Sequence, residues 1–271
     1  MVYICFIRPI QFSKMEPSNT AKPTAIGSNR VGPALALLLH AGRLTRYLPR
    51  LTGYNTLARF YQRHLPPHAQ LRINDFDGDI IMDLNLRHPI GICLWNYPDL
   101  LEKEAREAFL ATIHPGSTVL DIGANIGLYT LLAAKRGARV FAVEADPLNA
   151  AALRRHIELN GFSDRVKIFE MAATDCETTV SISRNPSNPG ESNIFTRGIP
   201  GGIAIGNTID SLNLPPIDVC KMDIEGAELL ALSGMRNTLS RSPNFRLVME
   251  YAEVHGSGQA LIKFLRAHFH E

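Results

Sequence analysis

One stretch constrains the fold of this chain more than any other: the 26 residues LDIGANIGLYTLLAAKRGARVFAVEA at positions 120–145. They predict an apolar strand, a turn with glycines, a helix and a second apolar strand. Lys135 and Arg136 stand in the last turn of the predicted helix, and Gly137 is placed as its C-terminal cap. Strand, helix and strand in this order are typical of a parallel sheet whose connections cross over one face.

The same alternation continues along the chain. Asp146 and Pro147 predict the start of a second helix, which should end near Asn160 and Gly161. Further strands are predicted at RVKIFEMA, IDVCKM and FRLVMEY, with helical stretches after the last two. Their continuous apolar runs indicate strands covered on both faces. We therefore predict an α/β fold, doubly wound around a mostly parallel sheet.

The chain before and between these units has a different character. Residues 1–30 are predicted to be a disordered leader, and residues 31–113 an extension of helices and a β-hairpin around Asp77 and Gly78. The main domain would be residues 114–271. Within it, TTVSIS predicts an extra strand, and RNPSNPGESNIFTRGIPGG predicts a long loop of the kind that is often functional.

Charge is unevenly distributed, although the formal net charge is only +2. Between Pro17 and Asn74 there are eight Lys or Arg residues and no Asp or Glu. Two predicted helices there would suit an acidic partner or a peripheral membrane contact, and a solvated helix face is the alternative. Their arginines are Arg43, Arg46, Arg50, Arg59 and Arg63.

Other features limit the location and the metal content. No stretch approaches the ~20 apolar residues of a membrane span. The four cysteines are scattered without metal-ligand spacing, which indicates a reducing compartment. We expect a cytoplasmic protein without a bound metal.

The turn DIGANIG at residues 121–127 indicates where a ligand would bind, because ligands of open α/β sheets lie outside the carboxyl ends of the strands. Gly123 and Gly127 allow positive φ and a close approach of the backbone, and Asn125 tolerates the left-handed region better than most side chains. A diphosphate site would carry the spacing G-x-G-x-x-G. Asp121 at this turn would instead repel phosphate and suit an ammonium group.

Acids also follow the next two predicted strands. Glu144 can accept hydrogen bonds from both ribose hydroxyls, and Asp175 can accept one from an adenine amino group. Together with Asp121 they match S-adenosylmethionine, which carries an amino group and a nucleoside. Two alternatives stay open: Asp175 as a plain turn residue, and a nicotinamide dinucleotide at Glu144.

The segments VLDIGANIGLYT, VFAVEADPLN, ELNG, AATD and CKMDIEGAELLALSGM resemble the FkbM family of S-adenosylmethionine-dependent methyltransferases, of the class I, Rossmann-like type. The resemblance covers about residues 70–260. It implies cofactor binding at Glu102, Asp121, Gly123, Asn125, Gly127, Glu144 and Asp175, and a second signature at Lys221, Asp223, Glu225, Gly226 and Glu228. Members usually end with a β-hairpin after the last helix, so we expect this sheet to lack its final strands.

The second signature is predicted to carry the chemistry. Asp223, at the end of its strand, could take a proton from the acceptor, orient it, or ligate a cation with Glu225 or Glu250. Lys221 lies two residues earlier on the same face and could neutralise a buried acid. The alternatives are a structural Lys/Asp pair, and helix-dipole roles for Glu225 and Glu228.

The acceptor is less constrained. Methyltransferases that act on nucleobase or glutamine nitrogen carry an Asn/Asp-Pro-Pro-aromatic tetrapeptide after this strand, whereas this chain has DIEG. We therefore expect a small-molecule or glycan hydroxyl acceptor and no nucleic acid. The resemblance implies sugars, glycolipids, polysaccharides or secondary metabolites. A catalytically inactive module that binds S-adenosylmethionine and a nicotinamide-dependent oxidoreductase remain alternatives.

Overall fold

The structure, a computed structural model, describes residues 63–64, 70–86, 89–96, 101–184, 192–193, 199–249 and 258–268. These residues form two compact units, one ending at Lys103 and the other beginning at Glu104. The predicted leader, Glu250, and four arginines of the basic region lie outside the described residues. The membrane contact and the predicted boundaries at residues 30 and 113 therefore stay predictions.

The unit that ends at Lys103 contains the predicted hairpin. Strand β1 (Gln70–Phe76) pairs antiparallel with β2 (Ile80–Asn85), and helix α3 (Pro89–Asn96) follows. Asp77 and Gly78 make the turn with φ of 48° and 99°. The hairpin prediction is confirmed.

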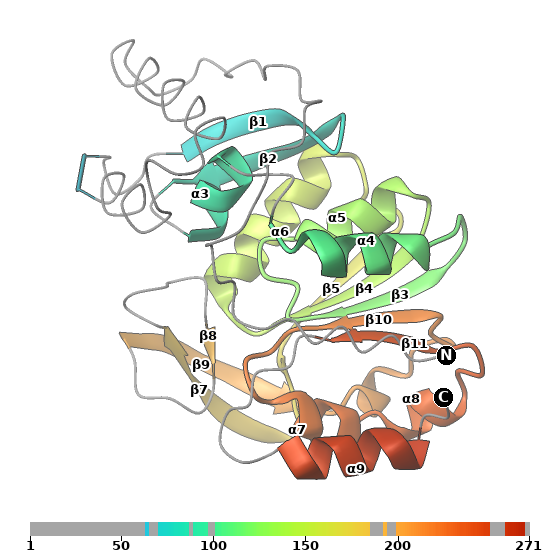
Figure 1. The fold of residues 1–271 in the computed structure, drawn as a ribbon. Helices are drawn as coiled ribbons and strands as arrows, with labels where there is room; N and C mark the ends of the chain where they lie inside the picture. Colours follow the sequence, from blue (N-terminus) through green and yellow to red (C-terminus); the bar gives the residue numbers. More distant parts are fainter. Residues whose placement is uncertain are drawn as a thin grey trace. The chain divides into compact units, whose positions relative to one another are not determined.

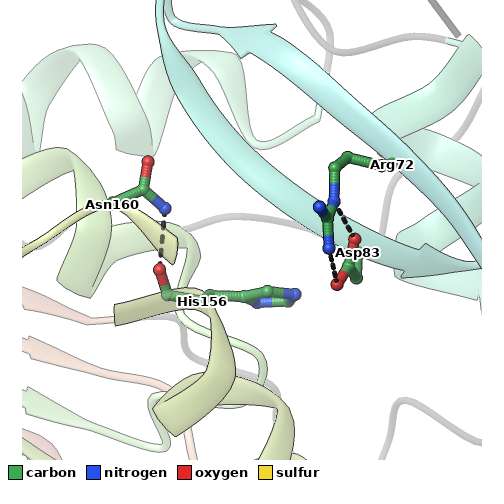
Figure 2. Close-up of polar contacts among 4 residues, drawn as sticks. All are labelled: Arg72, Asp83, His156 and Asn160. Atoms are coloured by element: carbon green, nitrogen blue, oxygen red, sulfur yellow. Dashed lines mark hydrogen bonds and ion pairs between the residues drawn. The ribbon is translucent and has the colours of Figure 1, made fainter. Parts of the chain in front are cut away.

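One ion pair crosses this hairpin. Arg72 lies opposite Asp83, and its Nε and Nη2 donate to the two carboxylate oxygens at 2.6 and 2.7 Å (Figure 2). The bond to Asp83 raises the pKa of Arg72. The pair is partly exposed, so its contribution is about 1 kcal/mol or less.

The other unit is built on a five-stranded parallel sheet. Its order is β11-β10-β3-β4-β5, and every neighbouring pair is parallel. The order reverses between β3 and β10, because the chain first adds β4 and β5 on one side of β3 and later adds β10 and β11 on the other. The strands are β3 (Thr118–Ile122), β4 (Arg139–Glu144), β5 (Val166–Glu170), β10 (Val219–Met222) and β11 (Arg246–Met249).

Helices cover both faces of this sheet (Figure 1). One face carries α4 (Lys103–Ala111), α5 (Leu128–Lys135) and α6 (Pro147–Leu159), and the other carries α7 (Glu228–Ser233), α8 (Arg236–Ser240) and α9 (Gly258–His268). Successive strand residues point to opposite faces. Leu120 and Ile122 of β3 belong to one buried cluster with residues of α7 and α9, whereas Asp121 bonds to α5. The doubly wound α/β prediction is confirmed.

The helix ends follow the local rules read from the sequence. Asp146 is the N-cap of α6 and accepts from the Leu148 amide at 2.9 Å, with Pro147 as the first helical residue. Gly137 and Gly161, just past the ends of α5 and α6, have φ of 81° and 67°. Both predicted helix stops are confirmed.

A second, four-stranded sheet lies in the same unit. Its order is β6-β9-β7-β8, and the strands are β6 (Ala172–Ala173), β7 (Thr178–Arg184), β8 (Ser192–Asn193) and β9 (Ile199–Asn207). The predicted extra strand TTVSIS is confirmed as β7. The predicted loop at residues 184–202 is wrong in three places, because Arg184 ends β7, Ser192–Asn193 form β8 and residues 199–202 open β9. The glycines there resemble a turn in the sequence, but Gly202 pairs with Ile182 of β7 beside a register shift, with φ of 119°. Within the described parts of the chain, no helix combines the length and apolarity needed to cross a membrane.

Candidate active site

The turn between β3 and α5 adopts the predicted left-handed geometry. φ is 80° at Gly123, 51° at Asn125 and 103° at Gly127. The amides of Gly123 and Ala124 both donate to the Val143 carbonyl, at 2.9 and 3.0 Å. The turn is therefore fixed to the neighbouring strand β4 by its backbone.

The two glycines also meet a steric limit set by the protein itself. A Cβ on Gly123 would lie 1.9 Å from the Asp223 carbonyl oxygen, and one on Gly127 would lie 2.6 Å from Leu153 Cδ1. The sequence predicted positive φ and the close approach of a ligand at these glycines, with a plain helix-entry turn as the alternative. The structure shows the nearest atoms to be those of β10's end and α6, so close packing within the fold accounts for both glycines.

Asp121 is buried beneath this turn, with 1% exposure. Its Oδ2 accepts from the Thr130 hydroxyl of α5 at 2.6 Å. Burial raises the pKa of Asp121 to about 6, and the Thr130 bond and the charge of Lys221 oppose that rise. At pH 7 the Asp121 carboxyl group is therefore mainly ionised, with a pKa about one unit below the pH.

Lys221 lies beside Asp121, because the two residues are register partners on β10 and β3. Its Nζ is 3.4 Å from Asp223 Oδ2 and 4.7 Å from the centroid of the Tyr129 ring. The Lys221 side chain is 2% exposed, whereas that of Asp223 is 29% exposed. Lys221 is thus paired with Asp223, and its cation also lies over an aromatic face.

Glu144 ends β4 and binds backbone amides with both oxygens. Oε2 accepts from the Asn125 amide at 2.7 Å, and Oε1 accepts from the Asp146 amide at 2.8 Å. Burial raises the pKa of Glu144 to about 7, and these two bonds oppose the rise. The Asn149 side chain also bonds to Glu144, and a carboxylate has about four acceptor positions, so one position is left for a hydroxyl donor.

The second signature forms the turn that follows β10. Glu225 and Gly226 adopt positive φ of 52° and 100°. Glu228 is buried at the start of α7, and its Oε1 accepts from the Gly226 amide at 3.0 Å. Burial raises its pKa. The helix-start interpretation therefore fits Glu228, while Asp223 and Glu225 are the partly exposed acids of the group.

Two predicted cofactor residues are placed differently from the others. The sequence placed Asp175 after the third strand, but β5 ends at Glu170, and Asp175 follows the short β6, which pairs with β9. It is exposed. Glu102 has φ of 47° and belongs to the unit that ends at Lys103, so its part in the site stays a prediction.

The arrangement has a net acidic character that suits a cationic ligand. Asp121, Asp223 and Glu144 supply three carboxyl groups at neighbouring strand ends, against the single ammonium of Lys221. The turn at residues 121–127 contains no Lys or Arg. These features fit an amino-acid sulfonium joined to a ribose better than an anionic diphosphate.

Sequence reasoning missed three side chains that support this site. Tyr129 and Thr130 stand in the first turn of α5, and His156 lies on α6 with its Nδ1 2.7 Å from the Ile126 carbonyl oxygen. A helical spacing predicts only that such residues are buried. Their partners come from other elements and appear only in the folded chain.

Parts of the chain are similar to methyltransferases from bacteria. The chain is 40% identical over 68 residues to the tRNA1(Val) (adenine(37)-N6)-methyltransferase of Shewanella amazonensis. The aligned segment covers 25% of this chain and 29% of that protein. The chain is 35% identical over 85 residues to an arginine N(omega)-methyltransferase of Streptomyces achromogenes, covering 30% and 24%. The chain thus spans less than a third of the length of these relatives.

A crystal structure of the methyltransferase FkbM from Methylobacillus flagellatus matches with a TM-score of 0.42 and 20% identity, over 65% of this chain and 48% of that one. The family model described as the methyltransferase FkbM domain matches residues 121–271, more than half of the chain. The match begins at Asp121 and includes the glycine turn, Glu144 and the second signature. The chain therefore belongs to the FkbM family of methyltransferases, and this membership confirms S-adenosylmethionine as the expected cofactor.

Proposed function

We propose that this protein transfers the methyl group of S-adenosylmethionine to a hydroxyl oxygen of a sugar, glycolipid, polysaccharide or secondary metabolite, in the cytoplasm. The observation that carries the proposal is the partly exposed Asp223 paired with the buried Lys221 at the reversal point of the sheet. Ligands of open α/β sheets bind at that point.

The cofactor would be held along the carboxyl ends of β3 and β4. Glu144 would accept from the ribose hydroxyls, and the charge of Asp121 would favour the cationic amino-acid end. Gly123, Asn125 and Gly127 would shape the turn between them. Asp175, which follows β6, would accept a hydrogen bond from the adenine amino group. Glu102 remains a predicted cofactor contact, which rests on the family resemblance.

When bound, the cofactor supplies a methyl group on a positively charged sulfur, which is a good leaving group. The protein has to hold the acceptor oxygen in line with that methyl group and receive one proton. Asp223 would take the hydroxyl proton as the carbon–oxygen bond forms and the carbon–sulfur bond breaks. Lys221 would hold the Asp223 carboxylate in place through their ion pair, and Glu225 would orient the acceptor from the same turn.

Two features bear on the acceptor atom. DIEG at residues 223–226 lacks the paired prolines and the aromatic residue of enzymes that methylate nucleobase nitrogen, which favours oxygen. A nitrogen acceptor, including one in a nucleic acid, is the second candidate. The matched relatives named for transfer RNA adenine and for arginine favour it.

The test uses the purified chain with methyl-labelled S-adenosylmethionine and separate pools of glycans, lipid extracts, small metabolites and transfer RNA. We expect label in a glycan, lipid or metabolite hydroxyl, and none in RNA. Asp223→Asn should lower the rate at least about 100-fold and leave cofactor affinity in calorimetry unchanged. Label in RNA or protein nitrogen would reject the oxygen acceptor, and cofactor binding without transfer to any pool would favour an inactive module.

A peripheral membrane contact is the second part of this proposal. Replacing Arg43, Arg46 and Arg50 with Ala should weaken binding to vesicles that contain anionic lipid. Unchanged vesicle binding and unchanged activity on the identified acceptor would reject it.

A further inference from the structure

A buried histidine on α6 contacts the cofactor turn. His156 is 1% exposed, and its Nδ1 lies 2.7 Å from the carbonyl oxygen of Ile126. Ile126 is the sixth residue of the DIGANIG turn. The contact therefore joins two elements, α6 and the turn, that are 30 residues apart in the sequence.

The chemistry of this contact determines which atom carries the hydrogen. A backbone carbonyl oxygen can only accept, so Nδ1 must be the donor. A neutral His156 thus carries its hydrogen on Nδ1, and the second ring nitrogen, Nε2, is then an acceptor. This tautomer is set by the Ile126 carbonyl.

The turn is held by a second contact from the same stretch of chain. The Asn125 amide donates to Glu144, the Asp146 amide donates to the other Glu144 oxygen, and Asp146 caps α6. Glu144 and His156 are therefore carried by one continuous strand, cap and helix. They hold two successive residues of the turn, Glu144 through the Asn125 amide and His156 through the Ile126 carbonyl.

The position of His156 along α6 is itself fixed. Its backbone carbonyl accepts from Asn160 Nδ2 at 2.7 Å, in the last turn of the helix (Figure 2). The Asn125 side chain completes the turn, since its Oδ1 accepts from the Ile126 amide at 2.8 Å. Both polar backbone groups of Ile126 are thereby used, one by Asn125 and one by His156.

We propose that His156 is a positioning residue for cofactor binding: its Nδ1–H holds the Ile126 carbonyl so that the Asn125 amide stays on Glu144 and the turn keeps its bound shape. The inference rests on the proposed function, because it assigns the turn and Glu144 to S-adenosylmethionine. His156 touches no reacting atom in this role. It preorganises the turn and so lowers the cost of ordering it when the cofactor binds.

The first test measures the affinity for S-adenosylhomocysteine by calorimetry in three variants. His156→Leu keeps the volume and removes the donor, and we expect affinity to fall about tenfold. His156→Asn places an amide donor at the same number of bonds from the backbone, and it should restore affinity to within about twofold. Ile157→Val, at the next and equally buried position on α6, should bind as the unsubstituted chain does.

A second readout does not depend on the cofactor or on the stability of a variant. Nitrogen-15 spectra of the histidine side chains, with His156→Asn used to assign the signal, should show the Nδ1–H tautomer at neutral pH in the unliganded protein. The Nε2–H tautomer would overturn the inference, because it cannot donate to Ile126 in this geometry.

The outcomes separate this inference from the proposed function. If the unsubstituted chain fails to bind S-adenosylhomocysteine, the proposed function falls and the inference with it. If that chain binds, and folded His156→Leu binds equally well or His156→Asn gives no rescue, only the role of His156 is overturned.

Discussion

The ends of β3 and β4 carry one buried acid each, but they satisfy those acids in different ways. Asp121 on β3 is bonded to the Thr130 hydroxyl and lies beside the Lys221 cation. Glu144 on β4 is bonded to the backbone amides of Asn125 and Asp146. The first acid is stabilised by a hydroxyl group and a nearby cation, whereas the second is stabilised mainly by backbone amides.

This difference separates the two tasks of the site. Charge pairing at β3 and β10 sets the electrostatics next to the partly exposed Asp223. Amide bonding at β4 sets the geometry of the turn that would surround the cofactor. We therefore expect substitutions at the first acid to show charge effects, and substitutions around the second to show geometric ones.

The largest expected effect comes from adding a methyl group at Gly123, where the turn after β3 lies against the end of β10. A methyl group at position 123 would overlap the Asp223 carbonyl, and φ there is 80°. Gly123→Ala should lower the free energy of unfolding by about 4 kcal/mol, from a left-handed alanine plus a backbone displacement. The measurement is chemical denaturation.

A matched control separates these two causes. Gly116 has φ of 86°, and a methyl group placed on its Cα would have no heavy atom within 4 Å. Gly116→Ala should therefore cost only about 1 to 2 kcal/mol. Equal losses at both positions would show that backbone strain alone determines the effect.

The next effect tests charge pairing. Lys221→Met removes the cation between Asp121 and Asp223, and at pH 8 we expect a loss of about 3 kcal/mol in unfolding free energy. The loss should be smaller at pH 5, where Asp121, with a pKa of about 6, is mainly protonated. Adding Asp121→Asn should recover more than half of the loss at pH 8.

An exposed lysine provides the control for this variant. Lys167 Nζ lies 4.8 Å from the Phe169 ring centroid, much as Lys221 lies over Tyr129. Lys167→Met should cost less than about 1 kcal/mol at both pH values. A pH-independent loss for Lys221→Met would contradict the charge-pair account.

A pH dependence distinguishes Glu144. Its folded-state pKa is raised from 4.5 to about 7, so the folded protein binds this proton more tightly than the unfolded chain does. Its stabilising contribution is complete below about pH 4.5 and is lost as pH rises through about 7. Glu144→Gln should flatten the decline in unfolding free energy between these values by about 2 kcal/mol.

Denaturation across this pH range checks the prediction, with Glu104→Gln on an exposed glutamate as the control. The control should keep the decline of the unsubstituted chain. Parallel curves for Glu144→Gln and the unsubstituted chain would show that Glu144 does not titrate in this window.

The smallest effect concerns the middle of the turn. Asn125 has φ of 51°, and its side chain accepts from the Ile126 amide. Asn125→Gly should change stability by less than about 0.5 kcal/mol, since glycine adopts this φ freely, whereas Asn125→Ala should cost about 1 kcal/mol. A larger loss for Gly than for Ala in thermal unfolding would show that the side-chain bond outweighs the backbone conformation.

Local rules account for the parts of this structure that could be predicted. The left-handed Asn125, the cap at Asp146 and the stop at Gly137 each depend on residues close in the sequence. Each strand of the parallel sheet could be predicted as well, because its continuous apolar run is also a local pattern. The β9 strand was missed because its pairing with β7, rather than its own glycine-rich residues, keeps it extended.

The residues themselves thus determined the main strand–helix units, the family and the acids predicted for the site. Only the tertiary structure decided which partners those acids have: Thr130 and Lys221 for Asp121, and two backbone amides for Glu144. It also decided that the glycines make room for Asp223 and Leu153. The physical reason is that caps and turns depend on neighbouring residues, whereas burial, and the pKa values it shifts, depend on elements that meet only when the chain folds.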